Sequence, residues 1–327
     1  MRRREFITLV GGAAAAWPLA ARAQQAGRTA RVGLLQPAPD NPVVAQGMPA
    51  FLDELKKSGF SEGQNLTIRF VRSDQDAQHL FAETAKLVSN VDVVVTAGSE
   101  IGLQAILAAS PTTPIVMWAI NFDPIAKGYV KSLARPGGNI TGIVSLQTEL
   151  AAKQVELLTE ALPERTRLAV LWDGLTADQF AAADRQARSL RLDVRSQKLE
   201  SPPYDFDAAF RRLAEGSPQM LLVLSSPFFA PSRAHIAELA IQQRLPAMFI
   251  FKTYAQAGGL MSYGVDPDAN YRQLGFYASK ILNGAKPADL PVEQAVKFEL
   301  VINLKTAKAI GVDLSTPIQV RADEVIE

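Results

Sequence analysis

The chain has 327 residues, about twice the usual length of one domain, and it contains no cysteine. Disulfides, thiolate metal sites and thiol nucleophiles are therefore excluded. Its two histidines, His79 and His235, both fall within expected helices, which argues against a multi-histidine metal centre. Hydrophobic residues make up 48% and charged residues 20% of the chain, as in ordinary globular proteins, so a disordered or coiled-coil chain is excluded.

Residues 1–23 have the layout of an export signal. Arg2, Arg3 and Arg4 precede sixteen uncharged residues, Phe6–Ala21, and Ala21-Arg22-Ala23 has the small residues of a cleavage site. This apolar segment is too short and too rich in Ala and Gly to span a membrane. The paired arginines also resemble a twin-arginine signal, although the general secretory route fits as well. By either route we expect an exported protein that is cleaved after Ala23.

The small positive net charge belongs to this signal. The whole chain carries +1, and residues 1–23 carry four Arg and one Glu, which leaves a net charge of −2 on the rest. A nucleic-acid-binding protein needs a basic footprint on its mature domain, so we expect no nucleic-acid partner. The mature part has no further apolar run long enough to cross a membrane, and we expect no direct membrane span.

In the first half of the mature chain, short apolar runs alternate with amphipathic stretches. The apolar runs predict strands at 30–36, 65–72, 91–96, 114–119 and 140–144. The amphipathic stretches predict helices at 43–58 and 76–88 and another directly after Ser99. A further helix is expected after Asp123, with this residue as its N-cap and Pro124 in its first turn.

The same alternation then starts again. Strands are expected at 167–172, 193–197, 219–224, 247–251, 259–263 and 297–303. Helices are expected at 149–162, 177–190, 206–214, 231–244, 266–283 and 304–310. Strands that alternate with helices indicate parallel α/β sheets, and two such series exceed one open sheet of usual width. The pattern therefore predicts an α/β protein with two Rossmann-like lobes.

Motifs of the common enzyme classes are absent. The sequence has no G-x-S-x-G nucleophile turn, no phosphate-binding loop of the Walker type, and no G-x-G-x-x-G after a strand. We therefore expect a binding protein rather than an enzyme, without a metal or a cofactor.

Polar and aromatic residues gather where the expected strands end, which is where parallel sheets bind ligands. These candidate ligand-binding residues are Gln36, Gly98, Ser99, Glu100, Asn121, Asp123, Asp173, Ser225, Ser226, Phe228 and Phe251. Because Gly98-Ser99-Glu100 begins a helix, its free N–H groups suit a carboxylate. The alternatives are a simple capped turn here, helix capping at Asp123, and a plain turn at Asp173.

Several separate blocks of the sequence resemble one family. They are residues Ser132–Ile143, Ala257–Gly264, Lys286–Val292, Lys297–Val312 and Arg321–Glu327, together with the export signal. The chain resembles the ABC-transporter substrate-binding proteins related to tryptophan- and tyrosine-binding proteins. The resemblance implies the type I periplasmic-binding fold, with three crossover strands near 142–144, 261–264 and 296–298.

The implied lobes are 28–143 with 265–296, and 144–262 with 299–327. Tyr263 lies at the second implied crossover, so we expect it to line the floor of the cleft between the lobes. The chain departs from the family pattern at Gly98-Ser99-Glu100, at Trp172-Asp173-Gly174 and at 250–253. The resemblance therefore specifies the fold but leaves the identity of the ligand open.

By this resemblance the protein is a periplasmic component of an ABC importer that passes a small-molecule ligand to an ABC permease in the inner membrane. We expect a small organic carboxylate, an amino acid or aromatic acid, because carboxylates at strand ends suit an ammonium group and aromatic residues suit a ring. Hinge closure of the lobes would bury the ligand. The alternative is a ligand-sensing module for a membrane receptor.

Overall fold

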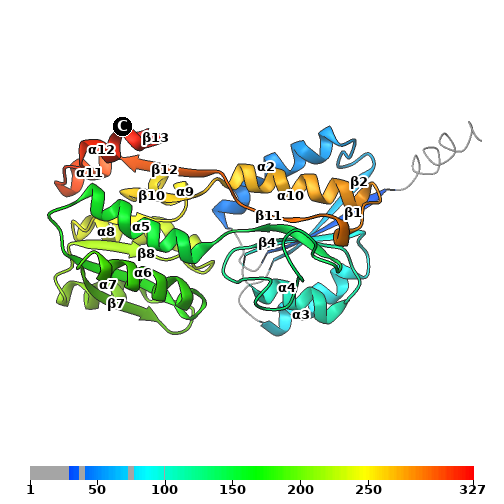
Figure 1. Cartoon of the computed structure of the whole chain (residues 1–327), viewed down its shortest axis with the longest axis horizontal. Helices are drawn as coiled ribbons and strands as arrows, with labels where there is room; N and C mark the ends of the chain where they lie inside the picture. The colour runs from blue at the N-terminus through cyan, green and yellow to red at the C-terminus, as the bar shows by residue number, and fades with distance from the viewer. Residues whose placement is uncertain (1–28, 37–40, 73–76, 99) are drawn as a thin grey trace, which may run out of the picture.

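The structure is a computed structural model that describes residues 29–36, 41–72, 77–98 and 100–327. The export signal and Ser99 lie outside the described residues. The chain forms two separate sheets, each flanked by helices, which lie side by side as two lobes (Figure 1). The prediction of an α/β protein with two Rossmann-like lobes is confirmed.

The first lobe is built on a six-stranded parallel sheet. Its strand order is β11 (Val292–Gln294), β5 (Ile140–Val144), β4 (Ile115–Ala119), β3 (Val93–Gly98), β1 (Ala30–Gln36) and β2 (Leu66–Arg72). Both faces are buried, so β3, β4 and β5 are nearly continuous apolar runs. Helices α2 (Pro42–Lys57) and α10 (Pro267–Leu282) cover one face, and α3 (Ala77–Val88) and α4 (Glu100–Ala109) cover the other (Figure 1).

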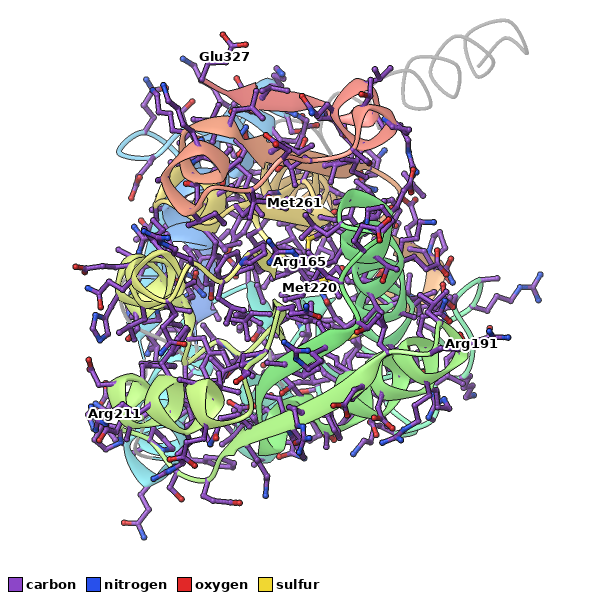
Figure 2. All side chains as sticks on the ribbon, turned by 90° about the vertical axis from the view of Figure 1, so that its left-hand side faces the viewer. Arg165, Arg191, Arg211, Met220, Met261 and Glu327 are labelled. Atoms are coloured by element: carbon purple, nitrogen blue, oxygen red, sulfur yellow. The ribbon has the colours of Figure 1, made fainter. Side chains whose placement is uncertain are left out.

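The second lobe is built on a seven-stranded sheet. Its order is β13 (Glu324–Ile326), β12 (Phe298–Asn303), β10 (Met261–Val265), β9 (Ala247–Phe249), β8 (Met220–Val223), β6 (Arg167–Asp173) and β7 (Asp193–Leu199). Among the strand pairs of this sheet in the described residues, β10–β12 alone is antiparallel. Met220 and Met261 lie in the middle of this lobe and are fully buried, whereas Arg191 and Arg211 lie at its periphery (Figure 2).

Helices also cover both faces of the second sheet. They are α5 (Gln147–Ala161), α6 (Ala177–Ser189), α7 (Phe206–Glu215), α8 (Arg233–Gln242), α9 (Lys252–Gln256), α11 (Leu304–Ile310) and α12 (Thr316–Arg321). Alternate residues of β6 and β8 belong to two different hydrophobic clusters, one that includes α5 and one that includes α7 and α8. This alternation follows from the two-residue period of a strand.

The chain passes between the two sheets three times. It leaves the first sheet after β5, returns after β10, and leaves again after β11. The second passage follows Val265, and α10 begins at Pro267. Since α10 packs against α2, residues far apart in the sequence meet in the first lobe.

One expected helix is absent. We expected Asp123 to cap a helix, but the described chain from Pro124 to Gly128 forms turns only. Asp123 does accept hydrogen bonds from the backbone N–H groups of Ile125 and Ala126. Gly128 then adopts a φ of 76°, a left-handed conformation that ends the turn before a helix can extend. The prediction of a helix after Asp123 was therefore wrong, although its capping residue was right.

The contact between α2 and α10 depends on Gly47. A Cβ atom at this position would lie 2.1 Å from Cδ2 of Tyr271, closer than any real side chain tolerates. The ring of Tyr271 packs there and meets Trp118 of β4 edge to face, with ring centroids 5.9 Å apart. The missing side chain thus leaves room for the Tyr271 ring beside Trp118.

Candidate functional site

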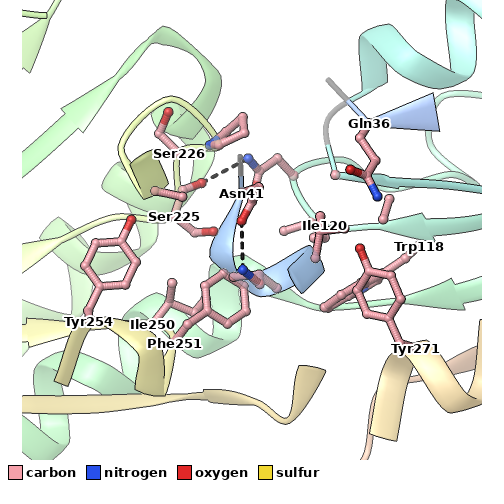
Figure 3. Close-up of a pocket in the computed structure, with 17 residues that line it drawn as sticks. Gln36, Asn41, Trp118, Ile120, Ser225, Ser226, Ile250, Phe251, Tyr254 and Tyr271 are labelled. Carbon is pink, nitrogen blue, oxygen red and sulfur yellow. Dashed lines mark hydrogen bonds between the residues drawn. The ribbon is translucent and has the colours of Figure 1, made fainter. Parts of the chain in front are cut away.

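A cavity of about 590 Å³, including space open to solvent, lies between the two lobes at the carboxyl ends of their strands. We call it the main cavity (Figure 3). It is lined by Gln36, Asn41, Val43, Val44, Ala97, Gly98, Trp118, Ile120, Asn121 and Tyr271 of the first lobe and by Ser225, Ser226, Pro227, Ala230, Ile250, Phe251 and Tyr254 of the second.

The lining of the main cavity is apolar and aromatic. Trp118, Tyr271, Tyr254 and Phe251 contribute four rings, and none of the lining residues in the described ranges is charged. Burial raises the pKa of Tyr254 and of Tyr271 above the ordinary tyrosine value, so both phenols stay neutral at physiological pH. The cavity is thus suited to a planar apolar group.

Two polar side chains of the first lobe are available to a ligand. The amide of Gln36 and the hydroxyl of Tyr271 both line the cavity, and the structure gives neither a hydrogen-bond partner among the described residues. They lie near each other at one end of the cavity (Figure 3). The indole N–H of Trp118, by contrast, donates to Ser145 at 2.7 Å, which fixes the plane of its ring.

Asn121 bridges the two lobes. It follows β4 in the first lobe, and its amide N–H donates to the backbone carbonyl of Ser225 in the second lobe at 3.0 Å. Its amide oxygen accepts from Gln179 of α6 at 2.9 Å. Gln179 in turn accepts from the backbone N–H of Ser225. Asn121 and Ser225 of this three-residue bridge line the main cavity.

Asp173 is fully buried and holds other residues in place. One of its oxygens accepts hydrogen bonds from the hydroxyl groups of Ser226 and Tyr204, and the other accepts from Leu175 and Thr176. Burial and the neighbouring charge of Asp173 raise the pKa of Tyr204. The carboxylate therefore orients Ser226 at the cavity but does not itself line it.

Gly98, at the end of β3, and Glu100, at the start of α4, have different surroundings. Gly98 lines the cavity. Glu100 accepts from the hydroxyl of Tyr129 at 2.7 Å and pairs with Lys127 at 3.1 Å. Burial disfavours its charge, but these two partners outweigh burial and hold the pKa of Glu100 below its ordinary value. Its negative charge is thus compensated away from the cavity.

The structure brings together six of the twelve predicted residues at the main cavity, namely Gln36, Gly98, Asn121, Ser225, Ser226 and Phe251. Asp123 lines a neighbouring cavity, and Phe228 packs edge to face on Tyr204. Tyr263 lies within β10, stacks on Phe298 and lines a groove with Leu146 and Val296 instead of the main cavity. Ser99 lies outside the described residues.

The aromatic residues Trp118 and Tyr271 were missed at the sequence level. Trp118 lies inside an apolar strand, where core packing is the ordinary interpretation. Tyr271 lies on a helix of the second half of the chain that returns to the first lobe. Gln179 of the Asn121 bridge was also missed, because it lies within the first turn of a helix where nothing distinguishes it from a surface residue.

No group of three or more potential metal ligands occurs among the described residues. Nor does any helix in those ranges combine the length and the apolar character that a membrane crossing requires.

Two lobes of mostly parallel sheets that enclose an aromatic cavity define a two-lobed ligand-binding protein of the type I periplasmic-binding class. Solved structures have the same architecture. A conserved domain protein from Vibrio cholerae O1 biovar El Tor is similar with a TM-score of 0.83 and 25% identity, covering 91% of this chain and all of that one. An ABC domain from Streptococcus pneumonia in complex with L-Trp is similar with a TM-score of 0.81, 25% identity and the same coverage.

The sequence also shows to which family within this class the chain belongs. Residues 40–326 match the family described as ABC transporter substrate binding protein, and the chain belongs to this family. A tyrosine-binding protein of Clostridioides difficile is 25% identical over 274 residues, which are 83% of this chain and 78% of that protein. The family consists of substrate-binding proteins, which agrees with the expectation that the chain is not an enzyme.

Proposed function

We propose that this protein is the periplasmic solute-binding component of an ABC importer, and that it binds an aromatic amino acid or a related aromatic acid between its two lobes. The observation that carries the proposal is the main cavity, whose four rings come from both lobes and whose described lining carries no charge. A similar protein is named for tyrosine, and a similar structure holds L-Trp.

The carboxylate of such a ligand has a suitable partner in the first turn of α4. This ten-residue helix begins beside Gly98, and N–H groups at a helix N-terminus attract anions. Glu100 would repel an anion, but its pairing with Lys127 and Tyr129 directs its charge away. Gln36 and Tyr271 would supply further hydrogen bonds.

Isothermal titration of the purified mature protein with L-tryptophan, L-tyrosine and indole-3-propionate tests this proposal. We expect at least one of them to bind with a dissociation constant in the micromolar range or below. L-alanine, which has the same amino-acid group without a ring, is the matched control and should bind far more weakly. Equal binding of L-alanine, or no binding of any aromatic acid, would contradict the proposal.

Export and transport are tested separately. Mass spectrometry of the periplasmic fraction should find the protein beginning at Gln24. Cells that lack the protein should lose uptake of the compound that binds in titration. Uptake unchanged by the deletion would contradict the role in an importer and favour the ligand-sensing alternative.

A further inference from the structure

Charged side chains gather where the second and third passages between the lobes run side by side. Asp266 follows β10 and Lys297 precedes β12, and these two strands pair antiparallel. The backbone N–H of Asp266 donates to the carbonyl of Lys297 at 3.0 Å, and the two side chains form an ion pair at 2.6 Å. The other carboxylate oxygen of Asp266 accepts from the backbone N–H of Asp268 and caps α10. Asp266 therefore ties both passages to a helix of the first lobe.

Glu299 lies in β12, on the second-lobe side of these passages. Its Oε1 is buried and has no hydrogen-bond partner among the described residues. Its Oε2 lies 3.9 Å from Nζ of Lys252, which is too far for a hydrogen bond, whereas Lys252 lies 3.0 Å from Glu324 of β13. A buried carboxylate oxygen without a hydrogen bond is destabilising when the group is ionised. The environment of Glu299 therefore favours its protonated form.

The charges around Glu299 do not balance. Glu299 and the groups that face it form the hinge cluster, which consists of Lys252 of α9, Asp266 and Lys297 of the two passages, Glu299 of β12 and Glu324 of β13. Its three carboxylates exceed its two ammonium groups by one negative charge. Two further carboxylates lie at its margin, where Asp268 attracts Lys297 and Asp323 accepts from the backbone N–H of Leu300. Burial and the two neighbouring carboxylates accordingly raise the pKa of Glu299.

The hinge cluster also adjoins the wall of the main cavity. Lys252 begins α9 directly after Ile250 and Phe251, which both line the cavity. Strand β10 packs tightly against this wall, since a Cβ atom at Gly264 would lie 2.1 Å from the carbonyl oxygen of Ile250. Gly264 is also the residue that pairs with Glu299. Glu299 is thus connected to the cavity wall through a single paired residue.

We propose that Glu299 is a proton switch in the hinge, whose protonation favours closure of the lobes and strengthens ligand binding. This inference rests on the proposed function, because it concerns the regulation of ligand binding at the main cavity. In the structure the lobes are joined by the Asn121 bridge, and the hinge cluster in this arrangement favours the protonated carboxyl. Opening would rotate Asp266, which α10 holds, away from Glu324 of the second lobe and disperse the surplus charge. Protonation, which the closed form favours, then favours closure by linkage.

Isothermal titration with L-tryptophan at pH 5 and at pH 7 tests the switch, because the net charge of L-tryptophan is the same at both values. The effect is fully present below about pH 4.5 and is lost as the pH rises through the higher pKa of Glu299 in the closed form. We expect the wild-type protein to bind about three- to tenfold more tightly at pH 5, the size of a shift of about half to one pKa unit. Glu299→Gln, which is neutral and of similar size, should bind equally at both pH values and at least as tightly as the wild type at pH 5.

Two further variants test the role of the hinge cluster. Glu324→Gln removes one carboxylate and frees Lys252 to pair with Glu299, so it should move the pH dependence to lower pH. Glu164→Gln, at an exposed position of the same lobe, is the matched control and should keep the pH dependence of the wild type. An unchanged pH dependence in Glu324→Gln would overturn the role of the cluster.

Small-angle scattering of the ligand-free protein separates the switch from the proposed function. The wild type should have a smaller radius of gyration at pH 5 than at pH 7, and Glu299→Gln should have the smaller radius at both. If L-tryptophan binds equally at both pH values, or if Glu299→Gln keeps the full pH dependence, the switch is wrong while the proposed function stands. If L-tryptophan does not bind but the radius changes with pH in the wild type alone, the switch holds and the ligand class is wrong.

Discussion

Gly98 ends β3 of the first lobe and lines the main cavity. Its φ of 121° lies in a region that residues with a Cβ atom rarely adopt, and it lines the cavity beside the start of α4. We expect Gly98→Ala to lower the free energy of unfolding by about 1–3 kcal/mol through backbone strain. It should also weaken L-tryptophan binding, because the new methyl group displaces the turn. Chemical denaturation and isothermal titration measure the two effects.

Gly128→Ala is the control for strain alone. Gly128 has a φ of 76°, and a Cβ atom there would meet nothing within 4 Å. Its substitution should lower stability while leaving binding unchanged. If Gly98→Ala lowered stability to the same extent without changing affinity, the turn before α4 would not contact the ligand.

At the scale of elements, the rule that ligands bind at strand ends identified from the sequence six of the seventeen residues that line the main cavity. Gln36 and Asn121 follow β1 and β4, whose carboxyl ends meet at one edge of the sheet. The direction of a side chain at such an edge was not predictable. Glu100 turns away because Tyr129 and Lys127, 29 and 27 residues further along the chain, hold it.

Helix α10 shows why other site residues could not be predicted. Its own periodicity defines a buried face, but not which sheet that face covers. That depends on the passage from β10 back to the first lobe and on the absence of a side chain at Gly47. Tyr271 therefore became a cavity residue only through tertiary packing.

A group of charged residues around Asp266, which lies between β10 and α10, also makes stability depend on pH. Glu299 of β12 is half-buried near Asp266 and Glu324, with Lys252 3.9 Å away. Burial raises the pKa of Glu299 above its ordinary value of 4.5, and the two neighbouring carboxylates add to this, although Lys252 and Lys297 oppose it. The folded protein thus binds this proton more tightly than the unfolded chain does.

Because the pKa of Glu299 is higher in the folded than in the unfolded protein, its protonated form stabilises the fold. The stability that the protonated Glu299 contributes is fully present below about pH 4.5 and is lost as the pH rises through the higher pKa of the folded state. We therefore expect Glu299→Gln to raise the melting temperature at neutral pH, with the difference disappearing below pH 4.5. Lys252 keeps Glu324 as a partner at 3.0 Å in this variant.

Differential scanning calorimetry between pH 4 and pH 8 measures this difference. Glu164→Gln, at an exposed position of the same lobe, is the control for the loss of one negative charge and should show no such pH dependence. A lower melting temperature of Glu299→Gln at neutral pH would mean that the attraction to Lys252 outweighs burial.

At the scale of the whole molecule, the two lobes meet across the main cavity through the Asn121 bridge. Its two hydrogen bonds between the lobes, at 2.9 and 3.0 Å, exist only while the lobes are together. If the lobes open and close as expected from the sequence, a ligand that contacts both lobes shifts the population toward the closed form. The bridge would add to that preference by about 1–3 kcal/mol, the net contribution of two hydrogen bonds.

Asn121→Ala should therefore weaken L-tryptophan binding while leaving each lobe folded. Small-angle scattering of the wild-type protein should show a smaller radius of gyration at saturating L-tryptophan than without it, and the variant should need more ligand for the same change. Asn90→Ala, at an exposed turn of the first lobe, is the control and should behave like the wild type. Identical scattering profiles with and without bound L-tryptophan would exclude closure and favour a cavity of fixed shape, in which the bridge is permanent.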